Sequence, residues 1–274
     1  MKIALSLLLL VLTTAPAWAD STKVFDRVVA KRELRCAYTI YPTFVEKDPN
    51  TGKFSGLFYD LMEEIGKQLE IKIVWAEEVG SDNIFEGLKT GRYDAVCTGY
   101  FGTPSRTFGG DFTQPVFYMP YYAYVRADEA RFKKFEDLNS DKVTFSTLDG
   151  ELSSVIQANR FPLSKAISLP GLTPATDRLE AVVSKKADVT MMEPSIAEEY
   201  MATHPNTLKQ FTDQPLEVGG SVIIIPHHEH ALKNMLDATI HSMTITNTLQ
   251  PIIKKHQKFK GSFFAPAKPY EAVE

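Results

Sequence analysis

The sequence predicts a two-lobed α/β protein, in which each lobe is a mainly parallel sheet flanked by helices and two extended segments join the lobes. Three observations predict this fold class. A strand and helix pattern begins near residue 34, a similar pattern returns near residue 143, and an extended apolar segment follows each of them. Strands that alternate with helices indicate parallel sheets with right-handed crossovers. A chain of 274 residues is long enough to form two cores.

The first α/β unit is recognised by its periodicity. An apolar residue stands at every fourth position of 57–69, which marks one face of a helix. A second helix is expected to carry Ile84, Phe85 and Leu88, with Asn83 as its N-cap and Gly91 as its end. The strands expected around these helices are Leu34 to Tyr38, Ile71 to Trp75 and Ala95 to Gly99.

The second unit repeats this order. A helix is expected from about Ser153 and another around 179–183. The expected strands are Val143 to Ser146, Ala166 to Leu169 and Val189 to Met192. In both units a helix ends in basic residues and an aspartate, Asp94 or Asp188, opens the next strand. This shared pattern favours two similar units over one long sheet.

Two extended segments, 118–125 and 218–225, flank the second unit and are suited to a two-stranded hinge. Gly219 and Gly220 give the backbone freedom there. We therefore expect the first lobe to contain 20–121 and 220–274, and the second to contain 122–219. The apolar positions of the C-terminal segment predict helices that return to the first lobe.

The N-terminus has the pattern of an export signal. Lys2 precedes an apolar run, and Ala17-Trp18-Ala19 fits the small-x-small cleavage pattern, which predicts a signal peptide over 1–19. The run is shorter than the roughly 20 residues of a membrane-spanning helix. The formal net charge of −4 gives no basic excess, so nucleic acid is not expected as a partner.

Two cysteines, Cys36 and Cys97, lie in strand-like segments. In an exported protein they could form a disulfide. They could equally be two buried small apolar residues. The sequence leaves both interpretations open, because it does not supply the geometry that a bridge needs.

Six short segments, in this order and at this spacing, resemble the family 3 extracellular solute-binding proteins, the amino-acid-binding components of ABC importers. These segments are Leu34–Ala37, Tyr41–Phe44, Gly56–Leu61, Gly91–Val96, Thr103–Arg106 and Asp111–Pro115. The resemblance implies the type II periplasmic-binding-protein fold, a periplasmic monomer without cofactor, and a hinge that closes on an amino acid or a related amine. It also implies delivery of the ligand to an inner-membrane ABC permease.

The resemblance assigns opposite ends of the ligand to opposite lobes. Arg106 matches the family's arginine that binds the ligand carboxylate, and a guanidinium is suited to this because it forms two parallel hydrogen bonds. Glu193 stands where the family usually has an aspartate that binds the ammonium group. Glu193 could instead cap the helix that begins at Pro194.

The remaining candidate ligand-binding residues come from four further segments. Tyr41 matches an aromatic wall, and Phe58 and Phe101 replace more polar residues of the family, so a more aromatic cleft is expected. Gly99 and Gly150 would bring backbone to the ligand. They complete the set of Tyr41, Phe58, Gly99, Phe101, Arg106, Gly150, Glu151 and Glu193.

The resemblance implies that backbone N–H groups at the helix terminus near Gly150 hold the ligand carboxylate, so Glu151, which brings like charge, is unexpected there. Either its side chain points away from the ligand and serves the helix dipole, or the ligand carries additional positive charge. The sequence does not decide between these alternatives.

Catalysis and ligand sensing are alternatives to binding for import. A few proteins similar to this family, the periplasmic cyclohexadienyl dehydratases, use the same cleft for catalysis. In this chain Glu193 could act as a general acid or base in such a cleft. A ligand-sensing subunit is a further alternative. The cluster His227-His228-Glu229-His230 lacks a matching set of ligands, so no metal site is expected. No hydrolase or phosphate-loop motif occurs, and we expect a binding protein that is not an enzyme.

Overall fold

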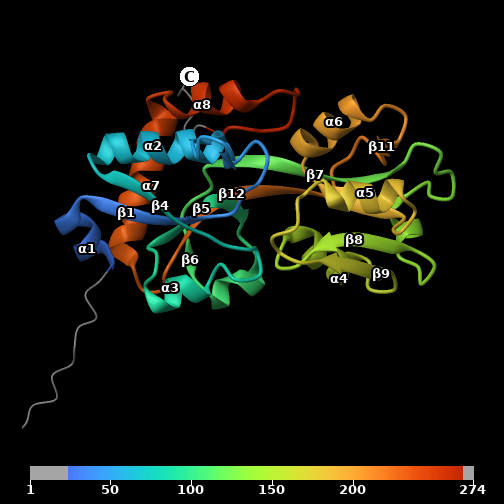
Figure 1. The fold of residues 1–274 in the computed structure, drawn as a ribbon, viewed down its shortest axis with the longest axis horizontal. Helices are drawn as coiled ribbons and strands as arrows, with labels where there is room; N and C mark the ends of the chain where they lie inside the picture. Colours follow the sequence, from blue (N-terminus) through green and yellow to red (C-terminus); the bar gives the residue numbers. More distant parts are fainter. Residues whose placement is uncertain (1–23, 268–274) are drawn as a thin grey trace, which may run out of the picture.

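The computed structural model describes residues 24–267 and shows two α/β lobes side by side along the long axis (Figure 1). The first lobe contains α1 (Val24–Lys31), β1 (Glu33–Tyr38), β2 (Glu46–Lys47), β3 (Phe54–Ser55), α2 (Leu57–Leu69), β4 (Lys72–Glu78), α3 (Glu86–Thr90), β5 (Ala95–Phe101), the 3-10 helix η1 (Pro104–Phe108), β6 (Asp111–Phe112), α7 (His230–Ile245) and α8 (Leu249–His256). The second contains the 3-10 helix η2 (Phe135–Leu138), β8 (Thr144–Leu148), α4 (Leu152–Arg160), β9 (Lys165–Leu169), α5 (Asp177–Val183), β10 (Val189–Met192), α6 (Pro194–Thr203) and β11 (Leu208–Gln210). The predicted fold class is confirmed. The predicted signal peptide, 1–19, lies outside the described residues.

Two long strands, β7 (Phe117–Arg126) and β12 (Glu217–Ile225), connect the lobes. They pair antiparallel from Phe117↔Ser221 to Tyr121↔Glu217. Beyond this ladder β7 pairs with β10 of the second lobe, and β12 pairs with β5 of the first. The predicted division at 121/122 falls where β7 changes partner from β12 to β10, whereas 219/220 lies within the β7–β12 ladder, before β12 pairs with β5 from Ser221. We retain this division as a proposal.

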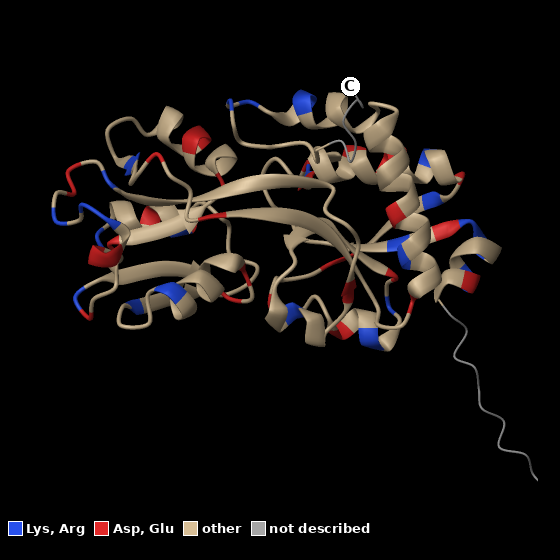
Figure 2. Cartoon of the chain, turned by 180° about the vertical axis from the view of Figure 1, so that it is seen from behind, with Lys and Arg blue, Asp and Glu red and all other residues tan. Residues whose placement is uncertain are grey.

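Each lobe has a mainly parallel sheet, as expected. In the first, β4, β1 and β5 are parallel neighbours and β12 is antiparallel to β5. In the second, β10, β8 and β9 are parallel and β7 is antiparallel to β10. The apolar face of α2 is buried, and α7 and α8 return to pack on this helix. Acidic and basic residues are interspersed over the helices and loops of both lobes (Figure 2).

The expectation that Asn83 caps a helix is wrong. Helix α3 begins at Glu86, and Asn83 lies in a turn where its N–H donates to the carbonyl of Gly80 at 3.0 Å. An N-cap side chain normally accepts from an N–H of the first helical turn. Here the hydroxyl of Tyr93 performs this function, because it accepts from the Gly87 N–H at 3.2 Å. Gly91 ends the helix in the left-handed region, at φ 69°, as expected.

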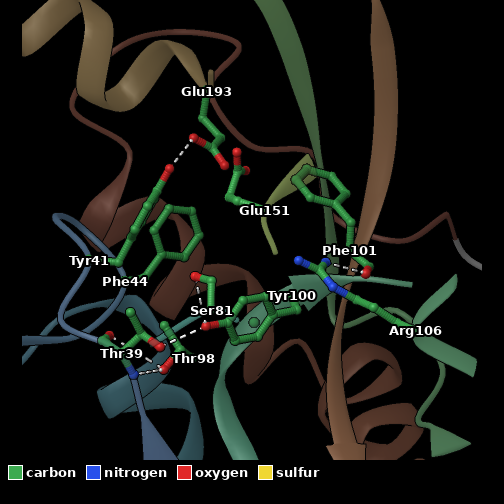
Figure 3. Close-up of a pocket in the computed structure, with 11 residues that line it drawn as sticks. Thr39, Tyr41, Phe44, Ser81, Thr98, Tyr100, Phe101, Arg106, Glu151 and Glu193 are labelled. Carbon is green, nitrogen blue, oxygen red and sulfur yellow. Dashed lines mark hydrogen bonds between the residues drawn. The ribbon is translucent and has the colours of Figure 1, made fainter. Parts of the chain in front are cut away.

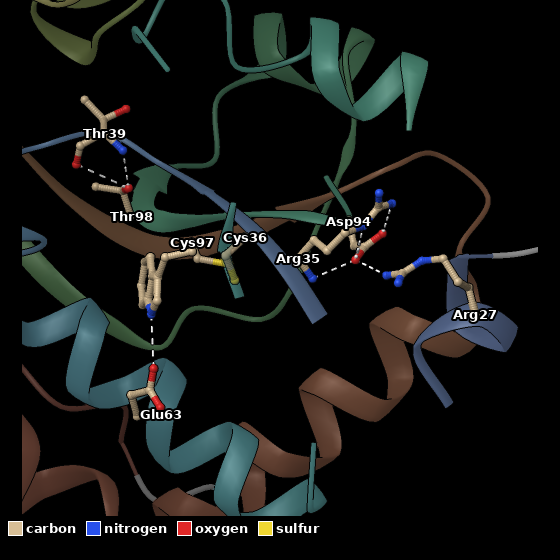
Figure 4. Close-up of a disulfide and its surroundings, with 9 residues drawn as sticks. Arg27, Arg35, Cys36, Thr39, Glu63, Asp94, Cys97 and Thr98 are labelled. Atoms are coloured by element: carbon tan, nitrogen blue, oxygen red, sulfur yellow. Dashed lines mark hydrogen bonds and ion pairs between the residues drawn. A yellow bond between two sulfur atoms is a disulfide. The ribbon is translucent and has the colours of Figure 1, made fainter. Parts of the chain in front are cut away.

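The aspartate shared by the two units has the same structural function in each. The Asp94 carboxylate accepts from the backbone N–H of Arg35 at 2.7 Å, and the Asp188 carboxylate accepts from that of Thr144 at 3.0 Å. Each aspartate therefore binds the start of the neighbouring strand, β1 or β8. Arg35 and Arg27 also form ion pairs with the buried Asp94 (Figure 4).

Cys36 and Cys97 form a disulfide between the neighbouring parallel strands β1 and β5 (Figure 4). Both side chains are fully buried, and their Cα atoms are 5.5 Å apart, within the usual range for a bridge. The structure thus decides the question that the sequence left open. The bridge links two residues 61 positions apart and closes a long loop of the first lobe.

No helix within 24–267 combines the length and apolar character that crossing a membrane requires.

Removal of the disulfide is expected to destabilise the first lobe. Replacement of both Cys36 and Cys97 by alanine should lower the free energy of unfolding by about 2–4 kcal/mol, since the unfolded chain regains the entropy of a long open loop. Urea titration followed by circular dichroism measures the change. Wild-type protein in dithiothreitol is the matched control and should shift in the same direction. Equal unfolding midpoints for all three samples would contradict the prediction.

Candidate functional site

A cavity lies between the lobes, beyond the carboxyl ends of β1, β5 and β10 (Figure 3). This is the usual place for a ligand in open α/β sheets. The cavity is small in this structure, with a volume of about 30 Å³. The lining residues are Thr39, Tyr41, Phe44, Ser81, Thr98, Gly99, Tyr100, Phe101, Arg106, Glu151 and Glu193. Six of the eight candidate residues are thus brought to one cavity, all but Phe58 and Gly150.

Arg106 enters the cavity from η1 in the first lobe. Its guanidinium is buried above the ring of Tyr100, with its central carbon 4.8 Å from the ring centroid. One amino group donates to the carbonyl of Phe101 at 2.8 Å, and the other donates to the carbonyl of Gly150 in the second lobe. The guanidinium is therefore held in a fixed orientation in the cavity wall, at a point where the lobes meet.

Glu193 enters from the second lobe, between β10 and α6. Although it occupies the N-cap position of α6, its side chain forms no cap hydrogen bond. Its carboxylate instead accepts from the Tyr41 hydroxyl at 2.9 Å. Burial, aided by the nearby charge of Glu151, raises the pKa of Glu193 to about 7. Glu193 can therefore hold or release a proton near neutral pH.

Glu151 lines the cavity and is also the N-cap of α4. Its carboxylate accepts from the Ser153 N–H at 2.9 Å, from the Ser153 hydroxyl at 2.6 Å and from the Tyr121 hydroxyl at 2.8 Å. Burial acts to raise the pKa of Glu151, but the charge of Arg178 and the hydrogen bonds from Ser153 outweigh it, so the pKa is lowered. Glu151 therefore serves the terminus of α4, as the first alternative predicts, but its side chain lines the cavity and does not point away from it.

Arg178 is a buried residue of the site that the sequence analysis missed. Its guanidinium donates to Glu151 at 2.8 Å and to the carbonyl of Met191 at 3.3 Å. It also donates to the hydroxyls of Tyr121 at 3.2 Å and of Tyr41 at 2.9 Å. The sequence contained a signal, because Arg178 lies four positions before Val182 and so shares the apolar face of α5.

Tyr41 joins the two lobes through its hydroxyl. This group accepts from Arg178 and donates to Glu193, both in the second lobe. Its ring comes from the turn after β1 and packs beside Phe44, with centroids 5.6 Å apart. Tyr41 therefore provides both an aromatic wall and a polar contact between the lobes.

Phe58 and Gly150 lie outside the residues that line the cavity. Phe58 is fully buried on α2, beneath Gly99, where a side chain on Gly99 would meet the phenyl ring at 1.8 Å. Gly99 also has a φ of +83°, a conformation that favours glycine, so both the backbone and the neighbouring phenyl ring require a residue without a side chain here. Gly150, at φ +72°, lies so close to the carbonyl of Ser81 that a Cβ would be 2.4 Å from the oxygen.

The first-lobe wall of the cavity is richer in hydroxyl groups than the sequence analysis expected. The Tyr100 hydroxyl lies 2.6 Å from that of Thr39 and 3.3 Å from that of Ser81. The Thr98 hydroxyl accepts from the Thr39 N–H at 2.8 Å. Phe44 and Phe101 supply apolar surface, so the cavity is both aromatic and rich in hydrogen-bonding groups.

The histidine cluster lies away from this cavity. His227 bonds to Asp111 at 2.9 Å, and His228 and His230 lie near each other on the surface. Within the described residues, no three His, Cys, Asp or Glu side chains are grouped so that they could hold a metal ion.

Two relatives found by sequence comparison are named as proteins that bind an amino acid. A probable histidine-binding protein of Campylobacter jejuni is 23% identical over 208 residues, which cover 75% of this chain and 77% of that protein. The ABC transporter arginine-binding protein 1 of Escherichia coli K12 is 24% identical over 215 residues, covering 77% of this chain and 85% of that protein.

Solved structures share the fold. An ancestral amino-acid-binding protein, described as a precursor of cyclohexadienyl dehydratase, has a TM-score of 0.75 at 24% identity and covers 86% of this chain and 100% of its own. A cysteine-binding protein of Campylobacter jejuni has a TM-score of 0.74 at 19% identity and covers 86% and 93%. The family model for bacterial extracellular solute-binding proteins, family 3, matches residues 34–259, and this chain therefore belongs to that family.

Proposed function

We propose that this protein captures an amino acid in the cavity between its lobes and delivers it to an ABC permease. The observation that carries the proposal is the placement of Arg106 and Glu193 on opposite lobes and on one cavity. A ligand with a carboxylate and an ammonium group can bind both side chains at once. Such a ligand favours the closed arrangement of the lobes, because only that arrangement provides both contacts.

The candidate residues have complementary functions in this proposal. Arg106 binds the carboxylate through its guanidinium, and Glu193 binds the ammonium group. Tyr41 and Phe101 form apolar walls, and Gly99 allows the backbone to approach the ligand closely. Gly150 allows the second lobe to approach Ser81 of the first lobe closely. The strands β7 and β12 form the hinge, since they are the long strands that join the two lobes.

The names of the relatives support an amino acid as the ligand, and the disulfide supports a periplasmic location. Proteins named as histidine- and arginine-binding resemble this chain over three quarters of its length. The disulfide favours an oxidising compartment, which agrees with the predicted export signal. We therefore infer a periplasmic monomer that docks on an inner-membrane permease.

A second candidate function is catalysis in the same cavity. It is supported by Glu193, whose pKa of about 7 would suit a general acid at neutral pH. It is also supported by the similarity in fold to the ancestral precursor of cyclohexadienyl dehydratase. Incubation with prephenate distinguishes the two functions. Turnover that is lost in Glu193→Gln would establish catalysis, whereas unchanged prephenate favours binding alone.

Arg106→Ala is expected to abolish binding. Loss of the guanidinium removes a charge-assisted contact from a buried site, so affinity should fall at least about hundredfold. Thermal-shift screening with the common amino acids, followed by calorimetry, measures the effect. Arg106→Lys, which keeps the charge but loses the fork, should be intermediate. Wild-type affinity in Arg106→Ala would refute the carboxylate assignment, provided that its unliganded unfolding midpoint shows a folded protein.

Binding should weaken as the pH falls below 7. The proposed ammonium contact requires ionised Glu193, and protonation becomes dominant below the pKa of about 7. Affinity for a ligand such as L-glutamine should therefore fall by up to about tenfold for each pH unit from 7 to 5.5. Calorimetry at several pH values measures this. Glu193→Gln should bind weakly and with a flat profile, whereas a flat wild-type profile would contradict the assignment.

A further inference from the structure

Two acidic residues, Glu151 and Glu193, line the second-lobe side of the cavity, whereas Arg106 is the one cationic residue among the described residues that line it. Counted by these residues alone, the cavity has an excess negative charge. It would then favour a ligand with two positive groups, which is the second alternative that the sequence left open for Glu151.

Arg178, which lies behind the cavity wall, compensates the excess negative charge. It is 0% exposed and does not line the cavity, yet it forms an ion pair with Glu151 at 2.8 Å. The hydroxyl and N–H of Ser153 bond to the same carboxylate oxygen as Arg178. Glu151 is therefore neutralised by its own surroundings.

Glu193 has a different environment. Within residues 24–267 no Lys, Arg or His lies at ion-pair distance from it, and its side-chain partner is the neutral hydroxyl of Tyr41. The negative charge of Glu151 disfavours ionisation of Glu193 more strongly than the positive charge of Arg178 favours it, and Arg178 and Glu193 are linked only through the Tyr41 hydroxyl. Glu193 is thus the single acid in the cavity whose charge is left for a ligand.

Within the part of the chain that the structure describes, the first-lobe wall of the cavity contains no acidic residue. It presents the hydroxyls of Thr39, Ser81, Thr98 and Tyr100, together with Phe44, Phe101 and the cation of Arg106. An additional ammonium or guanidinium group on the ligand would be buried there without a counter-ion, which is unfavourable. An additional carboxylate would find only Arg106, which the ligand's own carboxylate already occupies.

We propose that Arg178 determines the charge of the ligand, so that the site accepts amino acids with an uncharged side chain and discriminates against dibasic and acidic ones. This inference rests on the proposed function, because it assumes that Arg106 and Glu193 bind the carboxylate and the ammonium group. Arg178 is a positioning residue that acts through Glu151, and the neutral pair they form gives the cavity its charge balance.

Matched pairs of ligands test the inference on the wild-type protein. L-citrulline and L-arginine, L-norleucine and L-lysine, and L-glutamine and L-glutamate differ mainly in side-chain charge. For each pair in which binding is detected, calorimetry should show that the neutral member binds with an affinity at least about tenfold higher than the charged member. Tighter binding of arginine or lysine than of its neutral partner overturns the inference and leaves the proposed function intact. Failure of every amino acid to bind overturns the proposed function itself.

Variants of the ion pair test the assignment to Arg178. Arg178→Met leaves Glu151 as a second free acid, so the ratio of arginine to citrulline affinity should rise at least about tenfold. Glu151→Gln leaves the Arg178 charge unpaired and should shift preference the opposite way, toward glutamate over glutamine. The double variant Glu151→Gln/Arg178→Met has neither charge and should recover the wild-type preference.

The sign of these changes separates charge selection from a structural effect. A residue that only supports the fold would weaken all ligands alike and leave their affinity ratios unchanged. Unchanged ratios in Glu151→Gln would therefore overturn the proposal, and so would a double variant that folds but does not recover the wild-type preference. This holds even if Arg178→Met does not fold because it leaves a buried carboxylate unpaired.

Discussion

The antiparallel pairing of β7 with β12 is the constraint on which the site depends. These two strands carry the backbone from one lobe to the other, and their ladder determines which parts of the lobes can face each other. Tyr121 lies at the end of this ladder, opposite Glu217, and its hydroxyl donates to Glu151. The connection between the lobes is therefore bonded directly to the polar network around the cavity.

That network is concentrated around a few buried charges. Burying Arg178 and Glu151 carries a large desolvation penalty, which their mutual contact and the bonds to Ser153 and Tyr121 offset. An apolar pair of similar volume would stabilise a core about as well. The ion pair borders the cavity, where Arg178 also donates to the Tyr41 hydroxyl, and in our proposal it limits the negative charge that a ligand meets.

The two lobes are stabilised by similar local means but are not equivalent. Asp94 and Asp188 each bind the backbone at the start of a neighbouring strand, which accounts for the repeated sequence pattern. Only the first lobe carries the disulfide, between β1 and β5. The loops that follow these two strands hold Tyr41 and Arg106, so the bridge lies beneath the first-lobe half of the site.

The sequence by itself determined the fold class, most strands and helices, and the residues that meet from the two lobes. Apolar periodicity is local, so it predicts strands and helices directly, whereas the pairing of Arg106 with Glu193 came from the resemblance to the family. It missed the cap from Tyr93 and the charge pairing of Arg178. It also left open whether Cys36 and Cys97 are bonded. Each of these depends on side chains far apart in the chain, and only the tertiary structure brings them within bonding distance.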